Sequence, residues 1–373
     1  MEKRTSLQAG IENLYPGYFA LVMATGIVSI ASHLLGMDWI AWGLLWINLI
    51  AYLILWAMLL TRLVRYFPRV ISDLASHARG PGFFTLIAGT CVLGAQLILL
   101  AGQAALATAL WVLGTLLWVL VMYAFFTAVM VRQKKPNLEE GINGAWLIAT
   151  VATQSVAILG VLISARFGPQ QEIVLFFALV MYFIGCMLYL SIITLIFYRF
   201  TFLELTSAAV TPPYWINMGA VAITTLAGST LILNASGSPF LQEILMFLKG
   251  FTLFFWATGA WWIPILFILG AWRHLVKHYP LQYDPQYWGM VFPLGMFTTC
   301  TYQYARAAEL PFLLAIPRYF VYIALLAWLL TFLGLLWSLG RQLWPEGWTK
   351  NNRQSKDSRL LGQQVSPEKG RVE

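Results

Sequence analysis

Apolar residues run through this chain in ten long, nearly continuous stretches, and polar or charged residues separate one stretch from the next. Each stretch is about 20 residues long, the length of an α-helix that crosses the hydrocarbon core of a bilayer. Backbone polar groups inside lipid must be bonded within the protein, so we expect all ten stretches to be helices. The predicted spans are Pro16–Gly36, Ile40–Leu60, Gly82–Ala101, Ala105–Met130, Asn143–Ser164, Ile173–Tyr198, Tyr214–Asn234, Phe251–Gly270, Tyr287–Tyr304 and Tyr319–Leu339.

The odd-numbered and even-numbered spans differ in the polar residues that they carry. Odd spans hold hydroxyl and amide side chains at mid-depth, whereas even spans consist mostly of Leu, Trp, Phe and Ile. Two interpretations remain open: the polar side chains line a wet path, or they mediate close packing between helices. Under the first interpretation, the candidate pore-lining residues are Thr25, Ser29, Thr90, Thr150, Gln154, Asn217, Thr224 and Thr298.

The start of the first span has weaker relatives at the starts of the other odd spans. Each copy has a turn-forming residue or glycine, then aromatic residues, then an apolar helix that contains small residues. The copies begin at Pro16, Pro81, Asn143, Pro213 and Pro285, and equivalent points lie 62 to 73 residues apart. Recurrence at a regular spacing indicates a repeated structural unit. We therefore expect an all-α integral membrane protein of five helical hairpins, in a quasi-five-fold arrangement around a central pore.

Composition and charge agree with a membrane protein. Of the 373 residues, 60% are hydrophobic and only 10% are charged, against about a quarter charged in soluble proteins. Of the 23 lysines and arginines, 19 lie at the N-terminus, after even spans or in the tail. By the positive-inside rule, both termini are expected to be cytoplasmic, in the plasma (cell inner) membrane. The net charge of +8 follows from this distribution, so it does not indicate nucleic-acid binding.

Three parts of the chain are expected from these patterns. Residues 1–14 form a cytoplasmic N-terminus, and residues 15–340 form the ten-helix transport domain. Residues 341–373 form a basic cytoplasmic tail. Because this tail is polar and has no apolar periodicity, we expect it to be disordered.

The chemistry at mid-membrane depth is uncharged. All 15 carboxylates lie at span ends or in loops, whereas a proton relay or cation site within the membrane usually carries an ionised group. A path lined by hydroxyl and amide groups suits anions, because such groups replace part of the hydration shell without trapping the ion. The outer side carries Lys249, Arg306 and Arg318, which can concentrate anions at a pore mouth. Ordinary snorkelling of long cationic side chains at the membrane interface is the alternative explanation for each of them.

Signals for metal, cofactor or nucleotide binding are lacking in the sequence. His274 and His278 share a helical spacing but have no third ligand, and Cys91, Cys186 and Cys300 form no C-x-x-C pair. The phosphate-binding pattern G-x-x-x-x-G-K-[ST] does not occur. We therefore expect no metal site, no cofactor and no enzymatic activity.

Two segments and the order of the ten spans resemble a known family. YPGYFALVMATG from Tyr15 and YWGMVFPLG from Tyr287 are similar to the tellurite-resistance/C4-dicarboxylate transporter family. That family includes fungal malic acid transporters, sulfite exporters and the slow anion channels of plant guard cells. The likeness extends from about Tyr15 to Leu339. It implies ten helices as five hairpins, a pore lined by the odd helices, and often a homotrimer.

The resemblance also implies that a phenylalanine on the ninth helix occludes the pore. The matching FPL pattern assigns the gate to Phe292, with Phe297 as the alternative. Pro293 then marks a helix kink beside the gate, since proline lacks an amide hydrogen. Ala20 and Ala24 stand where channel-type members carry glycine, and the first motif resembles the carrier-like bacterial branch more closely.

The expected function is transport of small anions through a central pore occluded by Phe292. Inorganic anions and C4-dicarboxylates such as malate are the candidate substrates, and the family name adds tellurite resistance. The expected partners are a small anionic substrate and the lipid bilayer. One alternative is a proton-coupled dicarboxylate or sulfite carrier, for which flux would follow a pH gradient at zero voltage. Another is a membrane sensor or assembly subunit, for which no anion flux would be measured.

Overall fold

In a computed structural model, the described residues 6–343 form helices and connecting segments, with no strand among them. This confirms the predicted all-helical class. By its contacts the chain separates into two units, Met1–Thr331 and Phe332–Glu373. In the second unit, the guanidinium of Arg341 lies 4.8 Å from the ring centroid of Trp337. The disorder predicted for residues 341–373 stays a prediction, because residues 344–373 lie outside the described residues.

Five long helices are buried over most of their surface, and they correspond to the odd spans of the sequence. In the apolar window of the fourth of them, 94% of the residues are buried. Each begins with a short 3₁₀ turn. These inner helices are α2 (Ala20–Leu34), α5 (Phe84–Ala101), α8 (Ile148–Ile163), α10 (Ile216–Leu233) and α13 (Trp288–Ala307).

The other five long helices bury one face and expose large apolar side chains on the other. Only 22 to 33% of the apolar windows of four of them are buried, and the exposed residues include many Leu, Phe and Trp. Such faces suit contact with lipid chains. These outer helices are α3 (Asp38–Arg65), α6 (Ala104–Val131), α9 (Gln171–Phe202), α12 (Leu245–Ala271) and α14 (Ala315–Leu343).

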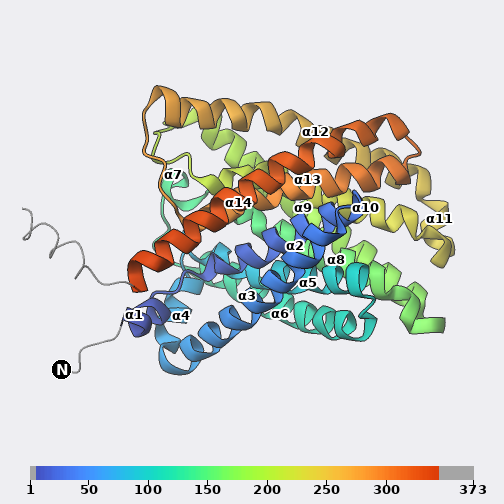
Figure 1. The fold of residues 1–373 in the computed structure, drawn as a ribbon, viewed down its shortest axis with the longest axis horizontal. Helices are drawn as coiled ribbons and strands as arrows, with labels where there is room; N and C mark the ends of the chain where they lie inside the picture. Colours follow the sequence, from blue (N-terminus) through green and yellow to red (C-terminus); the bar gives the residue numbers. More distant parts are fainter. Residues whose placement is uncertain (1–5, 344–373) are drawn as a thin grey trace, which may run out of the picture. The chain divides into compact units, whose positions relative to one another are not determined.

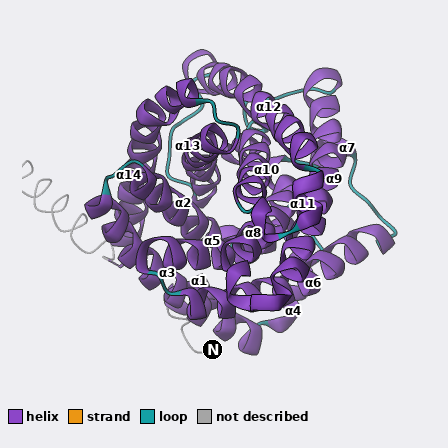
Figure 2. Ribbon diagram, turned by 90° about the vertical axis from the view of Figure 1, so that its right-hand side faces the viewer, coloured by secondary structure: helices purple, strands orange, loops and turns teal. Residues whose placement is uncertain are grey.

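The inner helices contact one another in a closed cycle. α2 packs against α5, α5 against α8, α8 against α10, α10 against α13, and α13 against α2. Seen from the end of the helices, the outer helices surround this cycle (Figure 2). Glycines permit the close approaches: a Cβ atom on Gly219 would lie 2.7 Å from Cγ of Pro293, and one on Gly295 would lie 2.9 Å from Cγ2 of Val28. Small residues at helix crossings are typical of membrane bundles.

The N-terminal turns of the inner helices meet at one end of the bundle. They contact one another in the same cyclic order as the helices that follow them, so all five inner helices run in the same direction. The short helices α1 (Ser6–Glu12), α4 (Phe67–Leu74) and α7 (Leu138–Gly141) lie at this end, and α11 (Pro239–Glu243) lies at the other (Figure 1). The turns are η1 (Pro16–Phe19), η2 (Gly80–Phe83), η3 (Gly144–Leu147), η5 (Pro212–Trp215) and η8 (Pro285–Tyr287).

Four outer helices carry, in their last turn or just beyond it, an arginine that makes the same kind of contact. Its guanidinium donates a hydrogen bond to a backbone carbonyl in the segment just before the preceding inner helix. We call these four residues the hairpin arginines, because each bond joins the two ends of one helix pair. Donor and acceptor are Arg62 and Glu12 (3.2 Å), Arg132 and Ala75 (3.1 Å), Arg199 and Glu139 (3.1 Å), and Arg273 and Val210.

Eight helical stretches in the described part of the chain are long and apolar enough to cross a membrane. One of them, the 59-residue stretch Gly144–Phe202, holds both α8 and α9, which meet near Gly168 with its positive φ of 52°. Helix α13 is not among the eight, because its threonines and glutamine lower its hydropathy. The outer helices also exceed their predicted lengths: α12 begins at Leu245 instead of Phe251. The arrangement as five hairpins with quasi-five-fold symmetry stays a prediction.

Candidate functional site

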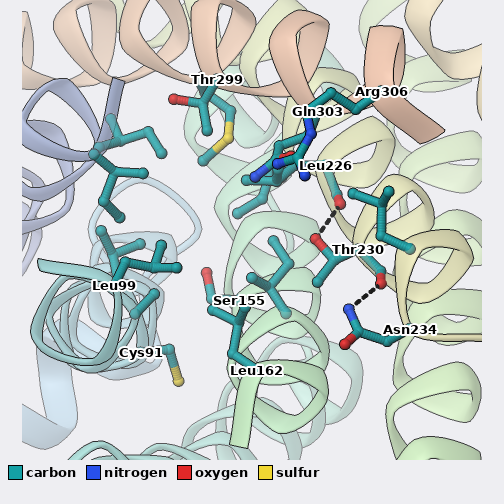
Figure 3. A pocket seen from close by; sticks show the side chains of 18 residues that line it. Cys91, Leu99, Ser155, Leu162, Leu226, Thr230, Asn234, Thr299, Gln303 and Arg306 are labelled. Carbon is teal, nitrogen blue, oxygen red and sulfur yellow. Dashed lines mark hydrogen bonds between the residues drawn. The ribbon is translucent and has the colours of Figure 1, made fainter. Parts of the chain in front are cut away.

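All five inner helices contribute side chains to one cavity of about 280 Å³. It lies along the C-terminal halves of these helices, away from the ring of 3₁₀ turns, and Figure 3 shows its lining. The polar and sulfur-bearing lining residues are Cys91, Ser155, Thr230, Asn234, Thr299, Gln303 and Arg306. The apolar lining residues are Ile27, Ile30, Val92, Ala95, Leu99, Ile158, Leu162, Ile223, Leu226, Leu233 and Met296.

Hydroxyl groups in the cavity are already bonded to their own helices. Oγ1 of Thr230 donates to the carbonyl of Leu226 at 2.7 Å, and Oγ1 of Thr299 donates to that of Gly295 at 3.0 Å. The Asn234 amide likewise donates to the carbonyl of Thr230 at 2.8 Å, as drawn in Figure 3. These side chains therefore present acceptor oxygens to the cavity in this conformation, and a hydroxyl must rotate before it can donate to a ligand.

Donor groups for an anion come mainly from helix α13. Arg306 is the only ionised side chain among the residues that line this cavity, and its guanidinium lies 3.5 Å from Oε1 of Gln303. An arginine carries five N–H donors and keeps its charge at any physiological pH. The C-terminal end of the cavity is therefore positively charged, while the remaining lining is neutral.

The predicted pore-lining residues of the first two inner helices contact outer helices. Thr25 accepts a hydrogen bond from Nε1 of Trp328 at 2.9 Å. Ser29 donates to the carbonyl of Ala41 at 2.7 Å. The hydroxyl of Thr90 lies 3.0 Å from that of Tyr52. All three predicted residues are fully buried.

The other five predicted residues are also buried within the bundle. The Gln154 amide donates to the carbonyl of Tyr182 at 3.0 Å and to Oγ1 of Thr224 at 3.3 Å. Thr298 donates to the carbonyl of its own helix four residues back. Oγ1 of Thr150 and both amide atoms of Asn217 have no hydrogen-bond partner among the described residues. None of the eight predicted residues lines the cavity, and their place in a pore stays a prediction.

Phe292 lies on the same face of α13 as the cavity lining. Residues 292, 296, 299, 303 and 306 follow one another at spacings of four and three, so they form one stripe along the helix. Phe292 is completely buried, one turn before the lining residue Met296. The alternative gate, Phe297, packs in another direction: its ring lies 6.3 Å from that of Trp256 on α12 and 5.2 Å from that of Phe320 on α14.

Thr299, Gln303 and Ser155 are not among the predicted lining residues, although the sequence carries a signal for two of them. Phe292 and Arg306 were both predicted site residues, and they are 14 positions apart, which is nearly four helical turns. Two residues with this separation lie on one face of a helix, and Thr299 and Gln303 complete that face. The number of hydroxyl groups in a span does not tell which of them line the cavity.

The three predicted mouth charges lie in different surroundings. Arg306 lines the cavity, as described above. Nζ of Lys249 lies 3.7 Å from a carboxylate oxygen of Glu309. Arg318 lines a separate cavity of about 620 Å³ with residues of α2 and α13. Only Arg306 of the three is therefore among the residues that line the inner cavity.

Ionisable groups at the other end of the inner helices are shifted toward their neutral forms. The pKa of Tyr15 is raised to about 12, mainly by burial and also by the negative charge of Asp284, while the nearby Arg79 opposes this shift. Burial lowers the pKa of His77, and the positive charges of Arg132 and Lys135 lower it further. At neutral pH this tyrosine and this histidine are therefore uncharged.

No group of three or more His, Cys, Asp or Glu side chains in the described residues could hold a metal ion.

Taken together, these features define a multi-pass helical membrane protein whose most buried helices enclose a cavity with one positive charge. Residues 13–336 match the SLAC1 family, which is described as voltage-dependent anion channel. The chain belongs to this family of anion channels and transporters, and the resemblance seen in its sequence motifs is confirmed at the level of the family.

Relatives in two distant microorganisms are similar to this chain. An uncharacterized transporter of Methanocaldococcus jannaschii is 27% identical over 306 residues, which are 78% of this chain and 84% of the relative. A second uncharacterized transporter of that organism is 26% identical over 309 residues, covering 79% and 86%. An uncharacterized membrane protein of Mycobacterium tuberculosis is 36% identical over 160 residues, covering 43% and 81%.

Proposed function

We propose that this protein conducts small anions along the axis of its five inner helices, and that Phe292 closes the path. The observation that carries the proposal is the stripe on α13, in which Phe292 directly precedes the cavity-lining residues Met296, Thr299, Gln303 and Arg306. An anion in the cavity therefore meets the Phe292 ring as the next side chain on that helix face. The path continues beyond the ring toward the five 3₁₀ turns.

The architecture in this proposal is ten membrane-spanning helices in five hairpins, with quasi-five-fold symmetry. The cyclic packing of α2, α5, α8, α10 and α13 supports it, and so does the matching cycle of their N-terminal turns. The hairpin arginines also support it, because the same arginine-to-carbonyl contact recurs in four of the five proposed helix pairs.

Selectivity for anions follows from charge in the proposed path. The lining residues of the cavity include one arginine and no carboxylate. At the other end, five helix N-termini converge, and each carries a partial positive charge of about half an elementary charge. Both mouths therefore attract anions, while the neutral middle lets an ion leave again. We place the 3₁₀ turns and both termini on the cytoplasmic side of the cell's inner membrane.

Movement of Phe292 is favoured by its neighbour Pro293. Proline has no amide hydrogen, so the carbonyl of Gly289 lacks its helical donor and the helix can bend at this point. The Pro293 ring packs against Gly219 on α10, where no side chain fills the space. A small change at this kink would swing the Phe292 ring out of the path.

The test is anion flux into proteoliposomes, with Phe292→Ala compared with Phe297→Ala. We expect Phe292→Ala to raise the flux at least about tenfold, which corresponds to a barrier that is lower by about 1.4 kcal/mol. Phe297→Ala is the matched control, because its ring contacts Trp256 and Phe320 of the outer helices. Chloride, nitrate, sulfite, malate and tellurite are tested as substrates. Equal flux in the folded Phe292→Ala and wild-type proteins would remove the gate from the proposal.

The same proteoliposomes separate this function from the two alternatives. Flux that is driven by voltage and is indifferent to a pH gradient supports a passive channel. Flux driven by a pH gradient at zero voltage supports a proton-coupled carrier of dicarboxylates or sulfite. A complete lack of flux for every anion supports a sensor or assembly subunit. The homotrimer that the family resemblance implies is tested by the mass of the purified complex.

A further inference from the structure

Arg273 is a buried hairpin arginine with an unused side-chain donor. Arg62 lies 2.6 Å from the carboxylate of Asp73, whereas Arg199, like Arg273, donates to a backbone carbonyl, that of Glu139, and also to the hydroxyl of Tyr214. Arg273 donates to the carbonyl of Val210, but it forms no ion pair with a described carboxylate. Its Nε atom has no hydrogen-bond partner among the described residues, although only 7% of the residue is exposed. A buried cation with an unused donor calls for an anionic ligand.

A cavity of about 170 Å³ lies beside Arg273, between the turn η5, the C-terminal end of α12 and the start of α13. Its walls are mostly apolar and include Trp215, Leu266, Leu269 and Met290. Leu281, another lining residue, is 76% exposed, so the cavity reaches the surface of the bundle. The polar groups that share this cavity with Arg273 belong to Thr211, Tyr214, His274 and Tyr287.

The backbone is irregular where Arg273 enters the cavity wall. Helix α12 ends in a π-helical turn over Trp272–Val276, and His278 follows with a positive φ of 50°. A π-turn adds a residue to the helical turn and often occurs at functional sites. The aromatic ring of Tyr279 folds back over the guanidinium, with a distance of 4.1 Å from Cζ to the ring centroid. The chain thus holds the arginine head in place at the end of the helix.

We propose that this cavity binds a membrane phospholipid through its anionic phosphate, with Nε of Arg273 as a donor. The acyl chain extends past Leu266 and Leu269 along the apolar surface of α12. A phospholipid fits better than free phosphate, because apolar walls replace none of the hydration that an inorganic anion loses. The exposed residues Lys277 and His278 at the same helix end add basic groups near an anionic headgroup. The inference requires a membrane-embedded chain, but it does not depend on anion conduction.

The test measures lipid binding to the purified full-length protein in detergent. Phosphatidylglycerol is added to delipidated protein, with phosphatidylcholine and inorganic phosphate as the other two additions. Bound lipid is counted by native mass spectrometry, and the shift in melting temperature is recorded for each addition. We expect phosphatidylglycerol to bind and to stabilise the wild-type protein, and we expect the other two additions to have much smaller effects.

Two variants address the site in different ways. Arg273→Gln removes the charge, and Leu269→Trp keeps the charge but fills the cavity. Loss of one charged hydrogen bond in Arg273→Gln should weaken phosphatidylglycerol binding at least about tenfold. We expect a loss of similar size in Leu269→Trp, because the indole occupies the space that the lipid needs. Arg132→Gln is the matched control, because Arg132 makes the same backbone contact but is exposed.

The outcomes decide between the two sources of phosphate and the absence of a site. Equal stabilisation by phosphatidylcholine or by inorganic phosphate would overturn the proposal of an anionic lipid site. Phosphatidylglycerol binding that Leu269→Trp and Arg273→Gln leave unchanged would overturn it as well. If Arg273→Gln does not fold, the Leu269→Trp result alone decides, because that variant retains the bond between Arg273 and Val210.

Discussion

Nε1 of Trp328 donates a 2.9 Å hydrogen bond to Oγ1 of Thr25, and both side chains are buried. The bond joins the last long helix, α14, to the first, α2, although 303 positions separate the two residues. Trp328 also approaches Trp288 of α13, with 6.5 Å between the ring centroids. One indole thus links α14 to two helices of the inner cycle, α2 and α13.

Loss of this bond should lower the stability of the bundle. We expect Trp328→Phe to cost about 1 kcal/mol, the usual net value of a buried hydrogen bond, and to lower the melting temperature in detergent. Thr25→Val should cost a similar amount, because it removes the hydroxyl that accepts this hydrogen bond. The double variant should cost less than the sum of the two, since both changes remove the same bond. Simple additivity would mean that the bond contributes nothing.

Reactivity of introduced cysteines should distinguish cavity-lining positions from their neighbours. In a protein whose three native cysteines are replaced by alanine, Ser155→Cys and Thr299→Cys should react with a small thiol reagent added to the cavity side. Gln154→Cys and Thr298→Cys are matched controls one position away, and they should react much more slowly. Faster reaction at position 154 or 298 would mean that the other face of the helix lines the path.

Arg306 should matter most for flux when the salt concentration is low. We expect Arg306→Gln to reduce anion flux at 0.01 M salt, where the Debye length is about 30 Å. The effect should shrink at 0.15 M salt, where the Debye length is about 8 Å. Arg318→Gln is the control, because Arg318 lines a different cavity. An equal loss of flux in both variants would indicate a general surface potential instead of a local charge.

A side chain at the crossing of α10 and α13 should destabilise the protein. A Cβ atom on Gly219 would lie 2.7 Å from Cγ of Pro293, and overpacking of this kind costs about 1–3 kcal/mol. We expect Gly219→Ala to lower the melting temperature. Gly43→Ala on α3 is the control, since no atom lies within 4 Å of the added methyl group. Its effect should be neutral or stabilising, because alanine favours helix over glycine.

The fold class and the contrast between two kinds of helix could be predicted from the sequence because they depend on composition. A span such as Ala105–Met130 is apolar around its whole circumference, whereas the span from Asn143 carries several polar groups that must be kept from lipid. The helix ends were less predictable. Lys249 interrupts the apolar run of the eighth span, but the helix continues through it to Leu245, since backbone bonding does not depend on hydropathy.

The identity of the cavity-lining residues could not be predicted from polarity. Gln154 and Ser155 are adjacent and both polar, yet Ser155 lines the cavity and Gln154 bonds to α9 and α10. Ser29 illustrates the cause: its hydroxyl reaches the carbonyl of Ala41 on α3. In a membrane bundle, hydroxyl groups serve helix contacts as readily as they serve a lumen. The direction of each side chain depends on the helical phase, which the positions of Phe292 and Arg306 provide for α13.

The hairpin arginines have a consequence for how the protein is made. Each one bonds a carbonyl of its own helix pair, no more than 63 residues earlier. The partners of each bond therefore leave the ribosome close together in time, so successive pairs can close in the order of synthesis. The contact between Trp328 and Thr25 must wait until almost all of the bundle has been translated. The contacts that close these four pairs are thus local in sequence, whereas the contact that joins α14 to α2 is not.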